Sequence, residues 1–480
     1  PTFIDAEAAR HVRDGADVKV TLAGALQFGV ERRLKDWVSR TQSEAGSAIV
    51  MDAGTGEILA LANVPDFDAN AKGARAAQRR RNRALTDAYE PGSTVKPFLM
   101  AAALLSGFRP HDELWGGKGK FTVQGRTISE AEETEQFEWI TLEDMVRRSS
   151  NVVAAKLALK LGAKSYVGVL RKMGFGSRSG LGFPGEIPGR IPDDQGMQPL
   201  TLANLGFGQG FVATRLQVLR AFGALANGGY LVTPKLVMGD GASAQTDRVR
   251  VLPDNVVKAV TRAMVRATEQ GGTGERARVE GFQIAGKTGT AQTVDPATRS
   301  YSRSRYISSF VGFAVGAGTP VVVFVSLDHP KGHYYAADTA APLFAEVFEE
   351  TALRMHLRGP ETINERLARV PVKPEPLHST QAAAVTPSPA VQAALKAMEG
   401  DPLVAQEENA TAPDAGPVDR TMPSLQGLSA REVVRKLGEA GGDLQVEIRG
   451  FGMVRHQTPG VGSPLRKGAR VSVLLGEDRR

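Results

Sequence analysis

The sequence predicts an α/β domain in which one sheet is completed from both ends of the segment and a helical block lies between the two groups of strands. Early in the chain, apolar and β-branched residues flank a turn at residues 52–56, which indicates two strands within residues 47–63. Three more strand patterns and an amphipathic helix come after residue 280. Because the residues between these groups have helical periodicity, the order of elements favours a single mixed domain.

The helical block begins at Ser93. A small apolar run predicts a helix from Ser93 to about Ser106, and Gly107 lies where a C-terminal glycine is expected. Residues 141–144, Thr-Leu-Glu-Asp, resemble a capping box that opens a short helix running into residues 147–151. Further helices are predicted up to Gly162, up to Gly174, over residues 215–227 and over residues 254–269.

The end of this domain changes to strand periodicity. Strands are predicted over residues 282–293, 305–315 and 319–328, and the last two are joined around residues 316–318. An amphipathic helix over residues 341–357 closes the segment. This final helix is expected to bury its apolar side against the sheet.

Beyond residue 359 the composition shifts. The following residues, up to about 420, are rich in proline, alanine and small polar residues with little periodicity, which predicts a flexible or semi-extended linker. Order returns from residue 421, with one helix opened at Ser429. Three short strands, over residues 444–450, 452–459 and 469–475, complete a small second globular unit.

The composition excludes several classes of function. The chain of 480 residues has no cysteine, which excludes thiol catalysis and cysteine-bound zinc. Lys and Arg number 59 against 52 Asp and Glu, a net charge of +7 that does not indicate a nucleic-acid partner, and the basic run at residues 79–83 is interpreted as a solvated segment. No stretch reaches the roughly 18 consecutive apolar residues of a membrane span. Because the chain starts at Pro1 without a signal-peptide pattern, we expect an upstream segment.

Ser93 and Lys96 form an S-x-x-K pair at the start of the first predicted helix. Residues three apart on a helix lie on one face, so the lysine amine can reach the serine hydroxyl. A lysine can act as the base for serine only if burial or a neighbouring positive charge lowers its pKa. Alone, the pair is a weak signal, because a serine N-cap beside a solvated lysine has the same spacing.

Two further motifs strengthen the hypothesis. Residues 149–151, Ser-Ser-Asn, follow the end of a capped helix, and residues 287–290, Lys-Thr-Gly-Thr, lie on a predicted strand. In chain order the three motifs match the S-x-x-K, S-x-N and K-T-G set of penicillin-recognising serine enzymes. Each is weak alone, but all three in order, each on the expected element, are strong evidence.

The resemblance extends beyond these motifs. Residues 81–98, 147–159 and 285–292 resemble segments of class B penicillin-binding proteins, the monofunctional transpeptidases of peptidoglycan synthesis. Glu90, before Pro-Gly-Ser, is more similar to the septal, FtsI-type members. Residues 422–475 resemble a PASTA domain, through residues 427–437 and through Gln457, Pro459, Gly462 and Gly468.

This resemblance implies the fold and its division along the chain. It implies a transpeptidase fold like that of penicillin-binding proteins and β-lactamases, with an antiparallel sheet and a helical block, followed by a small α+β PASTA-like domain. The expected boundaries are residues 1–17 for the remnant of an upstream pedestal region, 18–358 for the transpeptidase domain, 359–420 for the linker and 421–477 for the PASTA-like domain.

The resemblance also implies a role for each motif residue. Ser93 attacks the carbonyl between the last two D-alanines of a stem peptide, and Lys96 accepts its proton. Ser149 passes a proton to the departing D-alanine, Lys287 lowers the pKa of that relay by its charge, and Asn151 orients the substrate amide and Lys96. Thr288, Gly289 and Thr290 form the substrate-binding strand, and its two threonines hold the terminal carboxylate. Backbone N–H groups of Ser93 and Thr290 form the expected oxyanion hole.

Partners and location follow from the same family. The implied partners are peptidoglycan stem peptides, β-lactam antibiotics, a FtsW-type glycan polymerase and other division proteins; no cofactor or metal is implied. The implied location is the extracytoplasmic, periplasmic face of the cytoplasmic membrane, with an N-terminal anchor helix upstream of this chain.

Two other functions stay open. One is a D,D-carboxypeptidase or β-lactamase-type serine hydrolase, in which water replaces the amine acceptor, although no clear acidic loop motif for activating water is evident. The other is a non-catalytic cell-wall sensor or division scaffold. His329 and His333 are interpreted as part of a solvated turn rather than a metal site, because Pro330 and Gly332 lie between them. Residues 206–211 are interpreted as a turn and not as a dinucleotide loop.

Overall fold

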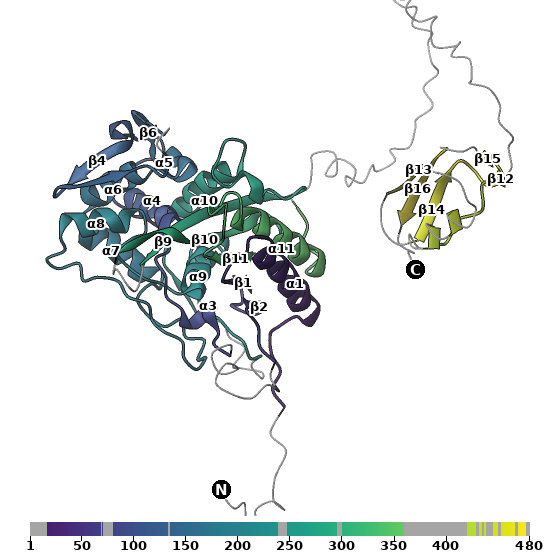
Figure 1. The fold of residues 1–480 in the computed structure, drawn as a ribbon, viewed down its shortest axis with the longest axis horizontal. Helices are drawn as coiled ribbons and strands as arrows, with labels where there is room; N and C mark the ends of the chain where they lie inside the picture. The colour runs from purple at the N-terminus through teal and green to yellow at the C-terminus, as the bar shows by residue number, and fades with distance from the viewer. Residues whose placement is uncertain are drawn as a thin grey trace, which may run out of the picture. The chain divides into compact units, whose positions relative to one another are not determined.

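The structure is a computed structural model that describes the following residues: 17–68, 70, 80–132, 135–238, 247–294, 300–359, 420–428, 432–433, 436–437, 445–449, 453–465 and 469–476. It divides into two compact units, Pro1–Val372 and Lys373–Arg480 (Figure 1). Residues 1–16 of the predicted upstream remnant and residues 360–419 of the predicted linker lie outside the described residues.

A five-stranded sheet forms the centre of the first unit. Its strand order is β2-β1-β11-β10-β9, and every neighbouring pair is antiparallel. The strands are β1 (Ala45–Asp52), β2 (Ile58–Val64), β9 (Gln283–Val294), β10 (Tyr301–Val315) and β11 (Val321–Asp328). Because β1 pairs with β11, the sheet joins the beginning of the domain to its end, as the sequence predicts. Strand β9 is an outer strand, so one of its edges is free of a sheet partner.

Both faces of the sheet are buried. Along β1, Ala48 and Val50 pack into one apolar cluster, whereas Ile49 and Met51 pack into the other. Side chains alternate between faces along a strand, so a strand covered on both sides is apolar at every position. Strand β11 shows the same pattern, with every residue buried. This explains the run of five apolar residues, 321–325, with which the strand begins.

Two layers of helices cover the sheet (Figure 1). Helices α1 (Gly24–Arg40) and α11 (Ala340–Arg354) contact each other and cover one face. The helical block covers the other face and supplies most of the second cluster. Its helices are α4 (Lys96–Leu105), α5 (Leu142–Arg148), α6 (Asn151–Leu161), α7 (Ala163–Lys172), α8 (Pro199–Gly206), α9 (Arg215–Ala226) and α10 (Asp254–Thr268).

Short elements complete the first unit. The helical turns are α3 (Arg83–Thr86), η2 (Gly92–Val95), η3 (Gly117–Gly119) and η5 (Glu275–Ala277). Three small strand pairs join β3 (Glu113–Trp115) to β6 (Trp139–Thr141), β4 (Lys120–Val123) to β5 (Arg126–Ser129), and β7 (Tyr230–Val232) to β8 (Arg248–Arg250).

The second unit contains a three-stranded sheet in the order β13-β16-β14. These strands are β13 (Gln445–Arg449), β14 (Met453–Thr458) and β16 (Arg470–Gly476), and a two-residue pair joins β12 (Arg420–Thr421) to β15 (Pro464–Leu465). The Gln457 side chain accepts from Leu425 N at 2.7 Å and donates to Pro423 O at 3.0 Å. These two bonds hold the segment after β12 against strand β14. The predicted helix start at Ser429, and Gly468, lie outside the described residues.

Most predicted elements are present, with two differences. No element is predicted for residues 24–40, where helix α1 lies, for residues 199–206, where helix α8 lies, or for the short elements α3 and β3 to β8. The predicted helix from Ser93 is instead a 3₁₀ turn, η2, that leads into α4, and Ser93 does not cap it: the residue before α4 is Val95. The remaining helices and the sheet strands lie within a few residues of their predicted ranges, and such differences at element ends are usual.

Candidate active site

The nucleophile turn, residues 91–96, is held by close backbone packing. Gly92 N donates to Gly208 O at 3.0 Å, and a Cβ atom on Gly208 would lie 1.9 Å from Gly92 O. Gly208 also has φ +83°, a conformation that favours glycine. The turn places Ser93 Oγ 2.9 Å from Lys96 Nζ. The serine and lysine predicted to act together are therefore in direct contact.

Lys96 is fully buried, with 0% of its side chain exposed. Its amine donates to Asn151 Oδ1 at 2.8 Å, to Ser149 Oγ at 3.2 Å and to the Ser149 carbonyl oxygen. All these partners are uncharged. Burial lowers the pKa of Lys96 to about 7, against an opposing effect of the carboxylates of Glu130 and Glu135. A large share of these amines is thus neutral near pH 7, as a general base requires.

Ser149 lies at the junction of two helices. Thr141 caps α5, since its side chain accepts from Asp144 N at 3.0 Å, and α5 ends at Arg148. Ser149 then adopts a left-handed conformation, φ 62° and ψ 33°, which is uncommon for a residue other than glycine, asparagine or aspartate. Ser150 caps the next helix, α6. This left-handed turn between the two helices points the Ser149 hydroxyl toward both Lys96 and Lys287.

Glu130 fixes this junction and was not predicted from the sequence. Its side chain is buried, and it accepts from Ser150 Oγ at 2.5 Å and from Asn151 N at 2.6 Å. A carboxylate at a helix N-terminus is stabilised by the unpaired N–H groups there. Because Glu130 follows strand β5, twenty residues from its partner Ser150, only the tertiary structure shows this contact.

Strand β9 carries Lys287, which is also fully buried. Its amine is 3.0 Å from Ser149 Oγ and 3.1 Å from Thr288 Oγ1. Burial, together with the neighbouring charge of Lys96, places the pKa of Lys287 well below its ordinary value. The Ser149 hydroxyl thus lies between two amines, each within 3.2 Å of its oxygen.

Gly289 allows β9 to lie against the nucleophile turn. A Cβ atom there would be 2.7 Å from Thr94 Cγ2 and 2.6 Å from Ser309 Oγ. Atoms essentially never approach so closely, so any side chain would push the strand away from the serine. Gly289 therefore contributes through close packing, and the flanking threonines supply the polar groups.

The two threonines of the strand are linked to neighbouring loops. Thr288 Oγ1 is 3.2 Å from Thr273 Oγ1, and Thr290 Oγ1 accepts from Ala336 N at 3.0 Å. Thr273 was not predicted from the sequence. Its loop follows α10, and no local motif places it beside the strand.

Glu90 links three segments around the serine. It precedes the nucleophile turn and accepts from Gly210 N at 2.8 Å and from Tyr301 Oη at 2.9 Å. Burial raises the pKa of Glu90. This carboxylate therefore connects the turn to the segment after α8 and to the start of β10.

The histidine pair is only partly as predicted. His333 is exposed, but His329 is mostly buried, and its Nδ1 is 2.9 Å from Glu44 Oε2. His329 thus belongs to a polar contact and not to a solvated turn, because the bend after β11 folds it back onto the sheet. Among the described residues no group of three or more His, Asp or Glu side chains is placed to hold a metal ion. None of the described helices is both long and apolar enough to cross a membrane.

The family model for the penicillin binding protein transpeptidase domain matches residues 46–349, which is most of the chain. The chain belongs to this family. A second family model, the PASTA domain, matches residues 420–477. Both motif-bearing helices and strand β9 lie inside the first match, so the resemblance to a class B penicillin-binding protein with a PASTA domain is confirmed.

Similar proteins carry transpeptidase names. The probable peptidoglycan D,D-transpeptidase PenA of Neisseria meningitidis is 33% identical over 347 residues, which cover 72% of this chain and 58% of that protein. Peptidoglycan D,D-transpeptidase FtsI of Escherichia coli is 31% identical and covers 72% of this chain and 56% of that protein. The chain thus spans little more than half the length of these relatives.

A solved structure has the same fold. Penicillin-binding protein 3 from Mycobacterium tuberculosis, complexed with aztreonam, superimposes with a TM-score of 0.65 at 30% identity, covering 73% of this chain and 82% of that one. The predicted fold class, an antiparallel sheet with a helical block, is confirmed by this similarity and by the observed sheet.

Proposed function

We propose that this chain is the transpeptidase part of a septal, FtsI-type enzyme that cross-links peptidoglycan stem peptides through a serine acyl-enzyme. The observation that carries the proposal is the buried Lys96 amine, 2.9 Å from Ser93 Oγ, with its pKa lowered to about 7. A serine next to a neutral amine is an activated nucleophile.

In the first step, Ser93 Oγ attacks the carbonyl carbon of the bond between the last two D-alanines, and Lys96 takes the hydroxyl proton. The C–N bond breaks, and Ser149 passes a proton to the departing amine. Lys287, within hydrogen-bond distance of the same hydroxyl, facilitates this relay. Asn151 orients Lys96, to which its Oδ1 is bonded at 2.8 Å.

Strand β9 binds the substrate in this proposal. Its outer edge adds the extended peptide as a further strand, a common mode of peptide recognition. Thr288 and Thr290 hold the terminal carboxylate, and backbone N–H groups of Ser93 and Thr290 stabilise the oxyanion. In the second step, the amine of a neighbouring stem peptide takes the acyl group from Ser93. β-Lactams acylate the same serine and remain bound.

A hydrolase is the second candidate. Such an enzyme needs a group that activates water at the acyl-enzyme. The carboxylate nearest the second motif, Glu130, already accepts short hydrogen bonds at 2.5 and 2.6 Å from Ser150 and Asn151. Because both oxygens of Glu130 already accept these hydrogen bonds, Glu130 is poorly placed to activate water, which favours acyl transfer over hydrolysis. A non-catalytic sensor or scaffold has no need of a buried amine beside a serine, because burying an amine is energetically costly.

The family suggests the setting of the reaction. We infer that the enzyme acts outside the cytoplasmic membrane, anchored by an N-terminal helix upstream of Pro1, beside a FtsW-type glycan polymerase and other division proteins. We further propose the division of the chain given above, with a transpeptidase domain over residues 18–358 and a PASTA-like domain over 421–477.

The test is acylation by a fluorescent penicillin, followed by intact mass over hours, for the parent chain and a Ser93→Ala variant. We expect a stable adduct on the parent alone. Rapid loss of the adduct would indicate a hydrolase, and no adduct on the parent would leave a sensor or scaffold.

A further inference from the structure

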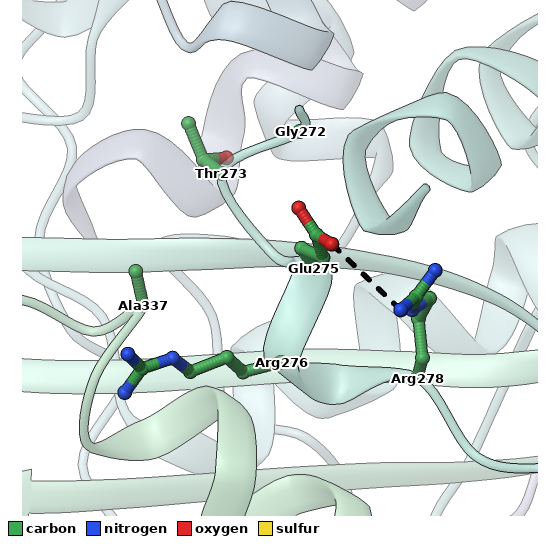
Figure 2. Close-up of a pocket in the computed structure, with 6 residues that line it drawn as sticks. All are labelled: Gly272, Thr273, Glu275, Arg276, Arg278 and Ala337. Atoms are coloured by element: carbon green, nitrogen blue, oxygen red, sulfur yellow. Dashed lines mark ion pairs between the residues drawn. The ribbon is translucent and has the colours of Figure 1, made fainter. Parts of the chain in front are cut away.

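A pocket of about 470 Å³ lies beside the substrate strand. It is lined by Gly272, Thr273, Glu275, Arg276, Arg278 and Ala337 (Figure 2). The first five belong to the segment after α10, which includes η5, and Ala337 belongs to the segment before α11. No predicted site residue lines the pocket.

Two contacts connect the pocket to the threonines that hold the substrate carboxylate in the proposed function. Thr273, in the pocket wall, has its Oγ1 3.2 Å from Thr288 Oγ1. Ala336, next to the lining residue Ala337, donates its N–H to Thr290 Oγ1 at 3.0 Å. Each of the two segments that line the pocket therefore makes a hydrogen bond to one of these two threonines.

The pocket presents two arginines, each in an exposed ion pair. Arg276 is 3.1 Å from Asp338 and its side chain is 64% exposed; Arg278 is 3.7 Å from Glu275 and 60% exposed. Figure 2 shows Arg276 extending toward Ala337, whereas Arg278 lies on the other side of η5 with its ion pair to Glu275. Exposed ion pairs contribute little to stability, so a ligand carboxylate can replace the acidic partner of such an arginine at little cost. A guanidinium also binds a carboxylate in a bidentate fashion.

The direction of the reaction suggests what enters this pocket. The leaving amine and the incoming amine bond to the same carbonyl carbon, and by microscopic reversibility the incoming amine takes the position that the leaving one vacated. The departing D-alanine has its carboxylate on Thr288 and Thr290 in the proposed function. The remainder of a longer acceptor must then continue past these threonines, where the pocket lies.

We propose that this pocket is the acceptor subsite, in which Arg276, on the same side of η5 as Ala337, binds a second carboxylate of the stem peptide that supplies the amine. The inference rests on the proposed function. In the transfer step, the ester bond from Ser93 Oγ to the acyl carbon breaks, the new C–N bond forms, and the amine proton passes to Ser93 Oγ.

The experiment compares two acceptors on one donor. A D-alanyl thioester acylates the enzyme, and transfer is followed by mass spectrometry with D-alanine or with the tripeptide L-Ala-γ-D-Glu-meso-diaminopimelate. D-Alanine has only the carboxylate next to its amine, so it does not reach the pocket. We expect an Arg276→Gln variant to lose about tenfold in transfer to the tripeptide and to keep transfer to D-alanine.

Two controls separate this effect from others. Arg171→Gln removes another exposed, ion-paired arginine, which lies on α7 with 49% of its side chain exposed, and should change neither transfer. Acylation by fluorescent penicillin needs no acceptor and should stay within about twofold of the parent in every variant.

The inference is overturned if the Arg276→Gln variant transfers to both acceptors as the parent does, or if D-alanine transfer or penicillin acylation falls as much as tripeptide transfer. A parent that transfers to D-alanine but not to the tripeptide also overturns it. A parent that forms no penicillin adduct refutes the proposed function first, and the acceptor subsite with it.

Discussion

Helices α4 and α9 both begin with a fully buried cation, and the two cations have different partners. Arg215, the first residue of α9, lies 2.6 and 2.8 Å from the carboxylate oxygens of Asp328 and 2.9 Å from Ser326 Oγ. Lys96, the first residue of α4, donates only to uncharged oxygen atoms. The positive end of a helix disfavours a cation at either place.

The difference shows how the same fold makes one buried cation structural and another reactive. A carboxylate offsets the desolvation of Arg215, whose guanidinium cannot give up its proton at ordinary pH. Lys96 donates to no carboxylate, and the charges of Glu130 and Glu135 offset its burial only in part, so its pKa falls to about 7. A missing counterion is therefore part of the site.

The largest effect is expected from removing the base. Lys96→Ala should lower the rate of penicillin acylation about a thousandfold, since general base catalysis contributes 10²–10⁴. Lys96→Arg should be as slow, because arginine stays protonated. The rate is measured by adduct formation over time, and Lys156→Ala, on α6, is the matched control. Acylation at the parent rate in Lys96→Ala would refute the assignment.

Replacing Arg215 and replacing Lys96 should have different effects on the free energy of unfolding. Arg215→Met should destabilise the domain by about 3–5 kcal/mol, because it leaves the Asp328 carboxylate buried without a partner. Lys96→Met should be neutral or stabilising, because it removes a buried amine that donates to no carboxylate and whose burial is offset only in part by Glu130 and Glu135. Chemical denaturation measures both. Equal losses in the two variants would contradict the distinction drawn here.

The pH dependence sharpens this contrast. Acylation requires neutral Lys96, so its rate should rise about tenfold per pH unit below pH 7 and level off above it. The folded pKa lies below the ordinary value of 10.5, so the unfolded chain binds more protons between these values and stability rises with pH there. The advantage of Lys96→Met should therefore be largest at and below pH 7 and shrink toward pH 10.5. A pH-independent advantage would show that Lys96 is not buried as an uncompensated amine.

The smallest effect concerns Glu130. Its charge raises the pKa of Lys96, so Glu130→Gln should move the midpoint of the acylation profile to lower pH, by about one unit. The amide keeps one oxygen to cap α6, so the fold should be retained. Glu132→Gln, an exposed neighbour, serves as the control. A midpoint that does not move would mean that Glu130 acts only through the helix.

Motif spacing makes much of the site predictable from the sequence. The order of the three motifs predicts which residues gather, and runs of apolar and β-branched residues predict β1, β2 and β9 to β11. Helix α1 gives a weaker signal: its residue before the helix is Ala23, which makes no side-chain cap, and its buried residues Leu26, Val30 and Leu34 form a narrow stripe.

The contacts that hold the motifs together could not be predicted. Glu130 reaches Ser150 from a short hairpin whose strands have only four residues each, too short to show a period. Thr273 and Thr288 meet only because α10 packs beside β9. The left-handed conformation of Ser149 is likewise set by two helices meeting, and serine gives no local indication of it.

The pairing of β1 with β11 has a consequence for the order in which the chain folds. Ala45 lies opposite Asp328, so the central pair of the sheet closes a loop that contains the whole helical block. Contacts so distant along the chain form slowly, because a long loop must close before any of them stabilises the fold. During synthesis, Ser93 and the whole helical block are made long before β11. The helical block can therefore be partly collapsed before β11 is available. Enzymatic activity should therefore appear late and all at once, when the last strand is inserted beside the first.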